Sequence, residues 1–263
     1  YGDHPYGTVD VGTPETVATL TRDDLIEAHR NALVRDRVLV GAVGDITPEQ
    51  LGTLLDAVLG NLPQSGPLLP PKVEPQITGG TTVVDFDTPQ SVALFGQRGI
   101  AVDDEDYFAA VLLNQVIGGG AFDSRLMQEV REKRGLSYSV YSAFAPGLHA
   151  GAFTVGLQTR PDQAAQAVAV AKDVVQGFVR EGPTEAELQA AKSNLVGGFA
   201  LRIDSNRKLL DNVANIAWNR LPLDYLSGWT RQIERVSAAD IQRAMARVLQ
   251  PERMVTVILG AKP

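Results

Sequence analysis

The chain has 263 residues, of which 44% are hydrophobic and 21% charged, and it contains no cysteine. These proportions are typical of a globular protein, and the absence of cysteine excludes disulfides and thiolate metal sites. The net charge of −7 argues against binding nucleic acid through a generally basic surface, and no apolar run approaches the roughly 20 residues that span a bilayer.

The chain opens with Tyr1-Gly2-Asp3-His4-Pro5, which contains neither an initiator methionine nor a signal-peptide pattern. We therefore expect the sequence to be a piece of a longer polypeptide. Any localisation signal would then lie outside it.

An internal repeat is the most informative feature of the sequence. Residues 20–44 and 236–260 align without a gap at an offset of 216 residues. Any two helix–turn–strand units can look alike by chance, but identities at the start, in the middle and at the end favour a duplication. The identical pairs are Asp24/Asp240, Ala28/Ala244, Leu33/Leu249, Arg37/Arg253 and Gly44/Gly260.

Both copies predict the same local structure. Thr21 or Ser237 is a helix N-cap, with an aspartate three residues later that completes a capping box. An amphipathic helix follows, then a turn, and then a strand at 38–43 or 254–259 that ends at glycine.

A proline-rich stretch begins the region between the two copies. Residues 63–80 predict an inter-domain linker. Residues 1–62 are then the carboxy-terminal remnant of a first domain, and residues 81–263 form a second domain. At the offset of the repeat, most of the first domain would lie before residue 1.

The second domain is predicted to contain strands in adjacent pairs and a block of helices, which indicates an α+β fold. The predicted strands are 81–87, 91–97, 136–144, 151–158 and 254–259, with a Pro146-Gly147 turn between the third and the fourth. The predicted helices are 104–117, stopped by Gly118-Gly119-Gly120, then 124–133, ending at Gly135, and a run within 161–248 starting at Pro161, Thr184, Asn206, Pro222 and Ser237.

The histidines do not predict a metal site. His4, His29 and His149 are the only ones, and none lies in H-E-x-x-H or in the inverted H-x-x-E-H motif. His29 lies in an amphipathic helix, where a surface or packing role is the simpler interpretation. A G-x-S-x-G elbow for a serine nucleophile is also absent.

The glycine run 118–120 precedes a helix and could bind an anion at the helix N-terminus. It lacks the lysine and hydroxyl of a P-loop, so a helix terminator is the simpler interpretation.

Arg131 and Tyr138 are seven residues apart, the first near the end of a predicted helix and the second on the predicted strand that follows. Gly135 would allow the chain to reverse between them. On that strand, Tyr138 and Val140 would share one face. A guanidinium and a phenol brought together in this way suit a peptide carbonyl or a developing oxyanion. Alternatively, Arg131 belongs to a solvated helix face together with Arg125 and Arg134.

The residues around this pair resemble a known family. Residues 126–141, LMQEVREKRGLSYSVY, with the preceding glycine run, resemble the second-domain signature of the pitrilysin family. That family includes insulin-degrading enzyme, mitochondrial processing peptidase and paired bacterial zinc-protease-like proteins. His4-Pro5-Tyr6-Gly7, followed by Gly12-Thr13, is similar to the end of the family's first domain. The resemblance covers nearly the whole chain.

The resemblance implies a pair of homologous α+β domains, each a mostly antiparallel sheet packed by helices, with the first domain truncated here. Zinc would be held by an inverted motif in the missing part or in a partner, so no cofactor and no metal ligand are expected in this chain. Arg131 and Tyr138 would be the catalytic donors to the substrate carbonyl or oxyanion. Gly118, Gly119 and Gly120 would contact the substrate.

Two functions follow from the resemblance. The first is a component of a zinc metallopeptidase, either a non-catalytic subunit or a carboxy-terminal half, that binds a peptide with a homologous zinc-bearing subunit or as a homodimer. The segment Phe122-Asp-Ser-Arg-Leu-Met127 favours the zinc-less bacterial subunits. The alternative is a structural assembly subunit like the core proteins of respiratory complexes. The bacterial members make a periplasmic location the expectation over a cytoplasmic one.

Overall fold

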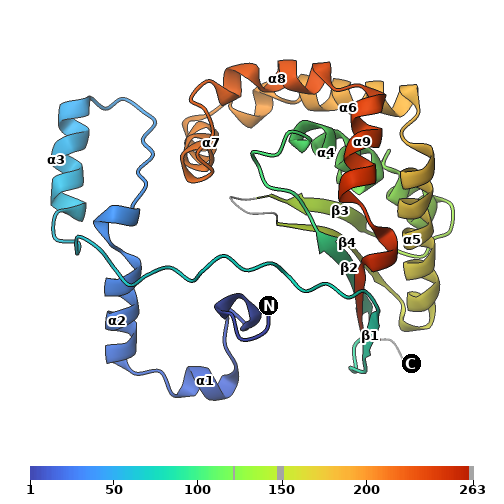
Figure 1. Cartoon of the computed structure of the whole chain (residues 1–263), viewed down its shortest axis with the longest axis horizontal. Helices are drawn as coiled ribbons and strands as arrows, with labels where there is room; N and C mark the ends of the chain where they lie inside the picture. Colours follow the sequence, from blue (N-terminus) through green and yellow to red (C-terminus); the bar gives the residue numbers. More distant parts are fainter. Residues whose placement is uncertain (121, 147–150, 261–263) are drawn as a thin grey trace. The chain divides into compact units, whose positions relative to one another are not determined.

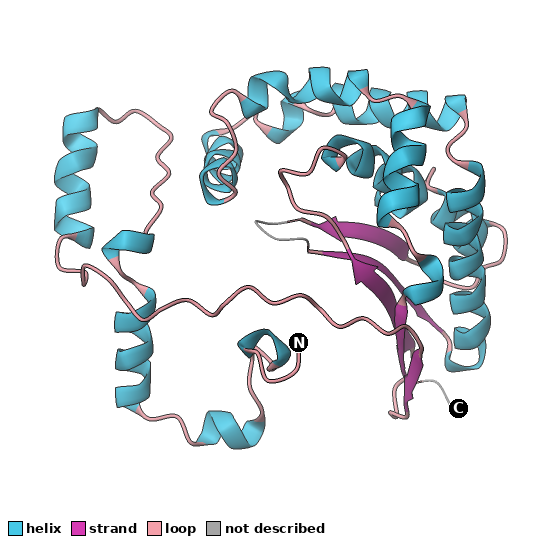
Figure 2. Ribbon diagram, in the orientation of Figure 1, coloured by secondary structure: helices cyan, strands magenta, loops and turns pink. Residues whose placement is uncertain are grey.

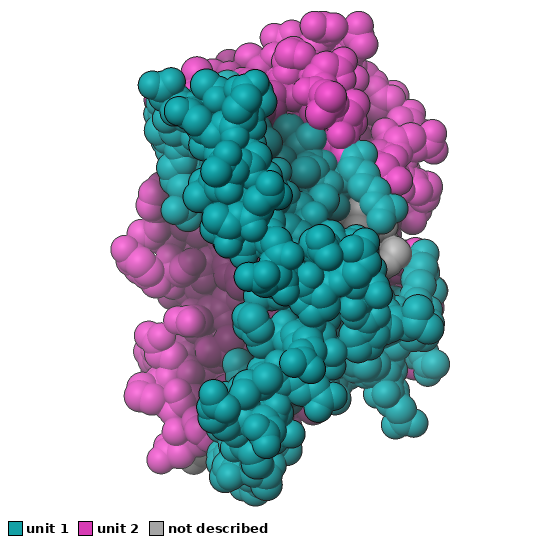
Figure 3. Space-filling view, turned by 90° about the vertical axis from the view of Figure 1, so that its left-hand side faces the viewer, with its two compact units in different colours: residues 1–76, 203–220 teal, residues 77–202, 221–263 magenta. Residues whose placement is uncertain are grey.

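The computed structural model describes residues 1–120, 122–146 and 151–260. They form two compact units, one from residues 1–76 with 203–220 and the other from residues 77–202 with residue 221 onward (Figure 3). The predicted division at residues 62 and 81 stays a prediction.

The second unit is built on a five-stranded sheet in the order β1-β5-β2-β4-β3 (Figure 1). β1 and β5 pair in parallel and every other neighbouring pair is antiparallel, which confirms the predicted α+β class with a mostly antiparallel sheet. The strands are β1 (Thr81–Val84), β2 (Ser91–Arg98), β3 (Val140–Ala145), β4 (Ala152–Thr159) and β5 (Val255–Leu259). Gly147 of the predicted turn between β3 and β4 lies outside the described residues.

Helices cover one face of this sheet (Figure 2). β2 alternates in burial, with Ala93 and Phe95 facing the helices while Val92 and Leu94 remain exposed, as a strand covered on one side requires. The α-helices of the unit are α4 (Tyr107–Asn114), α5 (Ala164–Glu181), α6 (Glu185–Gly197), α8 (Tyr225–Arg235) and α9 (Ala238–Val248). Short 3₁₀ turns occur at Pro161–Gln163, Ala200–Arg202 and Pro251–Arg253.

A buried carboxylate links α4 to α9. Asp106 is fully buried and accepts hydrogen bonds from Arg243 Nη2 and Arg247 Nε, each at 2.9 Å. Arg247 also pairs with Asp104. Burying a carboxylate is favourable only when it is paired, so these arginines are part of the packing of α9.

The first unit is helical and has almost no core. It contains α1 (Pro14–Ala18), α2 (Arg22–Ala32), α3 (Pro48–Leu59) and α7 (Asn206–Trp218), with 3₁₀ turns at Pro5–Gly7 and Arg35–Arg37. Val34 and Ile216 are its only buried hydrophobic side chains among the described residues.

The predicted strand at 38–43 is wrong for this structure. The segment is not paired with any described strand, and Leu39 and Val40 are exposed. A strand is stable only when its backbone groups are paired, and the described chain offers no neighbouring strand here. The turn before this segment is instead held by a loop contact, in which Arg35 N donates a hydrogen bond to Pro63 O at 2.9 Å.

No helix in the described part of the chain combines the length and the apolar character needed to cross a membrane.

Candidate functional site

Two π-helical segments mark the candidate site, one that ends within the glycine run and one that follows it. They are Gln115–Gly119, which continues α4, and Met127–Glu132. Their wider turns are seen in the hydrogen bonds from Gly120 N to Gln115 O and from Lys133 N to Gln128 O, both 3.0 Å. π-Helical turns are rare and frequently occur at functional sites. The sequence predicted helices here but not their winding.

The glycine run is required for packing. A Cβ at Gly118 would lie 2.6 Å from both Leu126 Cδ1 and the backbone nitrogen of Ser142, so only glycine allows the π-helical segment to approach β3 this closely. A Cβ at Gly119 or Gly120 would meet neighbouring atoms at 2.2 and 2.7 Å. The predicted contact of these glycines with substrate stays a prediction.

The structure brings Arg131 and Tyr138 together. Arg131 Cζ lies 4.6 Å from the centroid of the Tyr138 ring, which is a cation–π contact. Between them, Gly135 adopts a φ of +61° and donates to Arg131 O at 2.8 Å, while Leu136 N donates to Val130 O at 2.9 Å. This left-handed glycine cap reverses the chain as the sequence predicted.

The route to this contact differs from the prediction. β3 begins at Val140, so Tyr138 lies in the loop before the strand. Val140 is 2% exposed and Tyr138 is 83% exposed, so the two do not share a face. The prediction that strand alternation orients Tyr138 is therefore wrong, because the chain has not yet joined the sheet at this position.

Phe122 is a third member of the site that the sequence did not reveal. Arg131 Cζ lies 4.7 Å from the centroid of its ring. Phe122 is 56% exposed, and its carbonyl oxygen accepts a hydrogen bond of 2.9 Å from Gln128 Nε2. The sequence drew attention to Phe122 only as part of the segment that resembles the zinc-less subunits, and nothing connected it to Arg131.

The neighbouring cations of this segment are hydrogen-bonded to carboxylates. Arg125 donates to both carboxylate oxygens of Glu187, at 2.6 and 2.8 Å. Burial acts to raise the pKa of Glu187, but hydrogen bonds from Arg125 and from Thr184 outweigh it and lower the pKa to about 2. Lys133 and Arg134 both donate to Glu129, and these hydrogen bonds, that of Lys133 first, lower the pKa of Glu129.

The Arg131 guanidinium differs from these cations. Its side chain makes no hydrogen bond within the described part of the chain, and its ion pair is with the adjacent Glu132, at 3.4 Å between Nε and Oε1. The N–H donors of Arg131 are therefore less engaged than those of Arg125.

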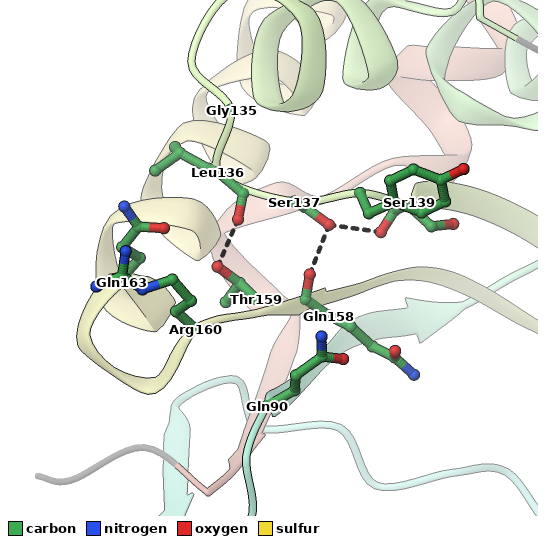
Figure 4. A pocket seen from close by; sticks show the side chains of 10 residues that line it. Gln90, Gly135, Leu136, Ser137, Ser139, Gln158, Thr159, Arg160 and Gln163 are labelled. Atoms are coloured by element: carbon green, nitrogen blue, oxygen red, sulfur yellow. Dashed lines mark hydrogen bonds between the residues drawn. The ribbon is translucent and has the colours of Figure 1, made fainter.

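Tyr138 also lines a pocket of about 320 Å³ at the ends of β3 and β4 (Figure 4). Its wall is held by Ser137 Oγ, which donates to the carbonyl oxygens of Ser139 and Gln158, both at 2.7 Å. Carboxamides and hydroxyls are among the groups that surround the pocket. It is lined by Gln90, Gly135, Leu136, Ser137, Tyr138, Ser139, Gln158, Thr159, Arg160 and Gln163; Arg131 and the glycine run are not part of the lining.

The described residues do not fit a zinc ion. They contain no group of three or more histidine, aspartate or glutamate side chains placed to hold a metal. His4 binds the carbonyl oxygen of Pro71 at 2.9 Å, and His29 is exposed on α2. His149 lies outside the described residues.

Comparison with known proteins gives a consistent set of relatives. A family model described as the peptidase M16 inactive domain matches residues 19–195. The chain is 32% identical to an uncharacterized zinc protease of Mycobacterium tuberculosis, over 99% of this chain and 60% of that protein. It is 30% identical to a non-peptidase homolog of Helicobacter pylori, over 92% of this chain and 56% of that protein.

A solved structure supports the same assignment. The crystal structure of a peptidase M16 inactive domain from Pseudomonas fluorescens matches with a TM-score of 0.90 at 33% identity, over 100% of this chain and 63% of that chain. The chain thus spans about three fifths of the length of the relatives it matches.

Proposed function

The chain belongs to the peptidase M16 family, and from this premise we propose that it is a component of a zinc peptidase that binds the peptide substrate through Arg131 and Tyr138. The observation that carries the proposal is the contact of the Arg131 guanidinium with the exposed Tyr138 ring, beside a pocket that Tyr138 lines. Its relatives include both a zinc protease and a non-peptidase homolog, so their names do not assign an activity to this chain.

Arg131 and Tyr138 offer the chemistry that peptide binding requires. A guanidinium and a phenol donate hydrogen bonds, and a peptide carbonyl or the oxyanion formed from it accepts them. The ring and guanidinium, in contact with each other, restrict each other's motion, so the donors are oriented before a peptide binds. This preorganisation favours the more negatively charged transition state over the ground state.

The pocket beside Tyr138 is the place where the adjoining peptide would lie. Carboxamides such as those of Gln90, Gln158 and Gln163 both donate and accept, which suits the alternating N–H and C=O groups of an extended main chain. The volume of about 320 Å³ accommodates a short stretch of peptide, at the lower end of typical binding sites, which are about 300–1,000 Å³.

Zinc, when bound to an enzyme of this class, activates the attacking water. Since the described residues offer no zinc site, we place it in a homologous subunit or in a part of the protein beyond this chain. The role of this chain is then to bind and orient the peptide.

The test is the double variant Arg131→Ala/Tyr138→Phe, in the complex of the full-length protein with its zinc-bearing homologous subunit. We expect turnover of fluorescein-labelled casein to fall by about two to three powers of ten. Arg207→Ala/Tyr6→Phe, which changes an exposed arginine and an exposed tyrosine elsewhere, is the matched control and should retain full activity. Full activity of the Arg131/Tyr138 variant would refute the role and favour the assembly subunit.

A further inference from the structure

The Arg131 guanidinium touches two aromatic rings that come from different parts of the chain. The rings are those of Phe122, at 4.7 Å, and Tyr138, at 4.6 Å. The two rings make no contact with each other among the described aromatic pairs. Tyr138 belongs to the proposed peptide site, whereas Phe122 does not line its pocket.

Phe122 is not held in place by burial. Its ring is 56% exposed, so it contributes little to a hydrophobic core. Its backbone is tied to the π-helical segment that carries Arg131 by the hydrogen bond from Gln128 Nε2, at 2.9 Å. This hydrogen bond holds the backbone of Phe122 next to the segment that carries Arg131.

Arg125, on the same stretch of chain, shows what this arrangement achieves. It lies 4.8 Å from the Phe178 ring and is fixed by hydrogen bonds to Glu187 and to the carbonyl oxygen of Gly182. Those bonds occupy its donors. Arg131 is held by two rings instead, and aromatic faces attract a guanidinium without accepting its in-plane N–H groups. Its orientation is thus restricted while its donors stay available.

We infer that Phe122 is a positioning residue, which holds the Arg131 guanidinium in the orientation that receives the peptide carbonyl. This inference rests on the proposed function of Arg131 and adds to it a residue outside the arginine–tyrosine pair. Phe122 acts through Arg131 and need not touch the peptide.

The test is a double-mutant cycle of Phe122→Leu and Arg131→Ala, in the complex of the full-length protein with its zinc-bearing homologous subunit and with fluorescein-labelled casein as substrate. Loss of one exposed cation–π contact predicts a fall of about twofold to fivefold in kcat/KM for Phe122→Leu. Phe122→Trp restores an aromatic face and should restore activity. In the Arg131→Ala background, Phe122→Leu should have no further effect.

The outcomes separate the two proposals. If Arg131→Ala leaves kcat/KM unchanged, the proposed function fails. If the Arg131→Ala variant is impaired but the Phe122→Leu variant is fully active, only the positioning role is overturned. The same holds if Phe122→Leu lowers kcat/KM by the same factor with and without Arg131→Ala. A direct readout is the ¹⁵Nε resonance of Arg131, which Phe122→Leu should shift by removing a ring current, while the melting temperature stays unchanged. An unshifted resonance would also overturn the role.

Discussion

The two copies of the repeat share the same capped helix and 3₁₀ turn, but their surroundings differ. α2 spans 22–32 and α9 spans 238–248, and the 3₁₀ turns that follow are again 216 residues apart. In each capping box the backbone N–H of the N-cap residue donates to the aspartate at 2.8 Å, and the aspartate N–H donates back at 3.2 Å.

Burial distinguishes the copies. α9 buries four side chains, Ile241, Ala244, Met245 and Val248, whereas α2 buries none. β5 lies between β1 and β2, whereas residues 38–43 have no strand partner in the described chain. The comparison teaches that caps and helices follow from nearby residues, while a strand requires neighbours that the local sequence cannot supply.

The largest expected difference between the copies is in core packing. Ile241 is fully buried, so Ile241→Ala should lower the free energy of unfolding of the second unit by about 3 kcal/mol. Leu25, the counterpart of Ile241, is 60% exposed, so Leu25→Ala should change the free energy of unfolding of the first unit by less than about 0.5 kcal/mol. Urea unfolding measures both, followed by Trp229 fluorescence for the second unit and by Trp218 fluorescence for the first, each with the other tryptophan replaced by phenylalanine. Equal effects would show that α2 is buried in solution.

A smaller difference concerns the ion pairs of α9. Arg243 and Arg247 bind Asp106, whereas the equivalent residues of the first copy are Glu27 and Asn31. Asp106→Asn should lower the free energy of unfolding by about 2 kcal/mol, since both arginines are half-exposed and can turn to water.

The exposed Glu105 provides the control for this variant. Glu105→Gln removes the same charge one residue away and should be neutral within about 0.5 kcal/mol in the same urea titration. If Asp106→Asn were equally neutral, the ion pairs would contribute nothing to the docking of α9.

The smallest effect is shared by the two copies and appears on acidification. Hydrogen bonds from the backbone and side chain of Ser237 lower the pKa of Asp240 to about 2, and those of Thr21 lower the pKa of Asp24. A folded pKa below the unfolded value of about 3.9 stabilises the helix above that pH, and the contribution is lost as pH falls towards about 2 for Asp240.

Carboxyl-carbon NMR titration measures this effect in both copies. Thr21→Ala and Ser237→Ala should each return the aspartate midpoint towards about 3.9. Ser237→Ala should also lower the free energy of unfolding by about 1 kcal/mol. Ordinary midpoints in the unmutated protein would show that the capping boxes do not persist in solution.

The sequence was sufficient where a local signal decides the structure. The helix starts at Thr184 and Ser237 and the reversal at Gly135 are found as predicted, because a cap is satisfied within a few residues. The contact between Arg131 and Tyr138 was also predicted, although the loop geometry behind it was not.

Other parts of the site depend on packing. The π-helical winding of the segment that carries Arg131 has no local sequence signal, and Leu126, just before that segment, packs against the backbone of Gly118. The contact between Phe122 and Arg131 joins residues that no sequence signal connects, so it could not be recognised beforehand. The pocket beside Tyr138 combines three segments distant in sequence.

The place of β5 in the sheet also has a consequence for biosynthesis. β5 follows every other described element in the chain, yet it lies between β1 and β2. During synthesis, β1 therefore has no neighbour, and one edge of β2 stays open, until residues 255–259 leave the ribosome. Sheets closed by such distant segments form slowly and expose unpaired strand edges meanwhile, so the nascent second unit is a natural client for chaperones until its last strand is inserted.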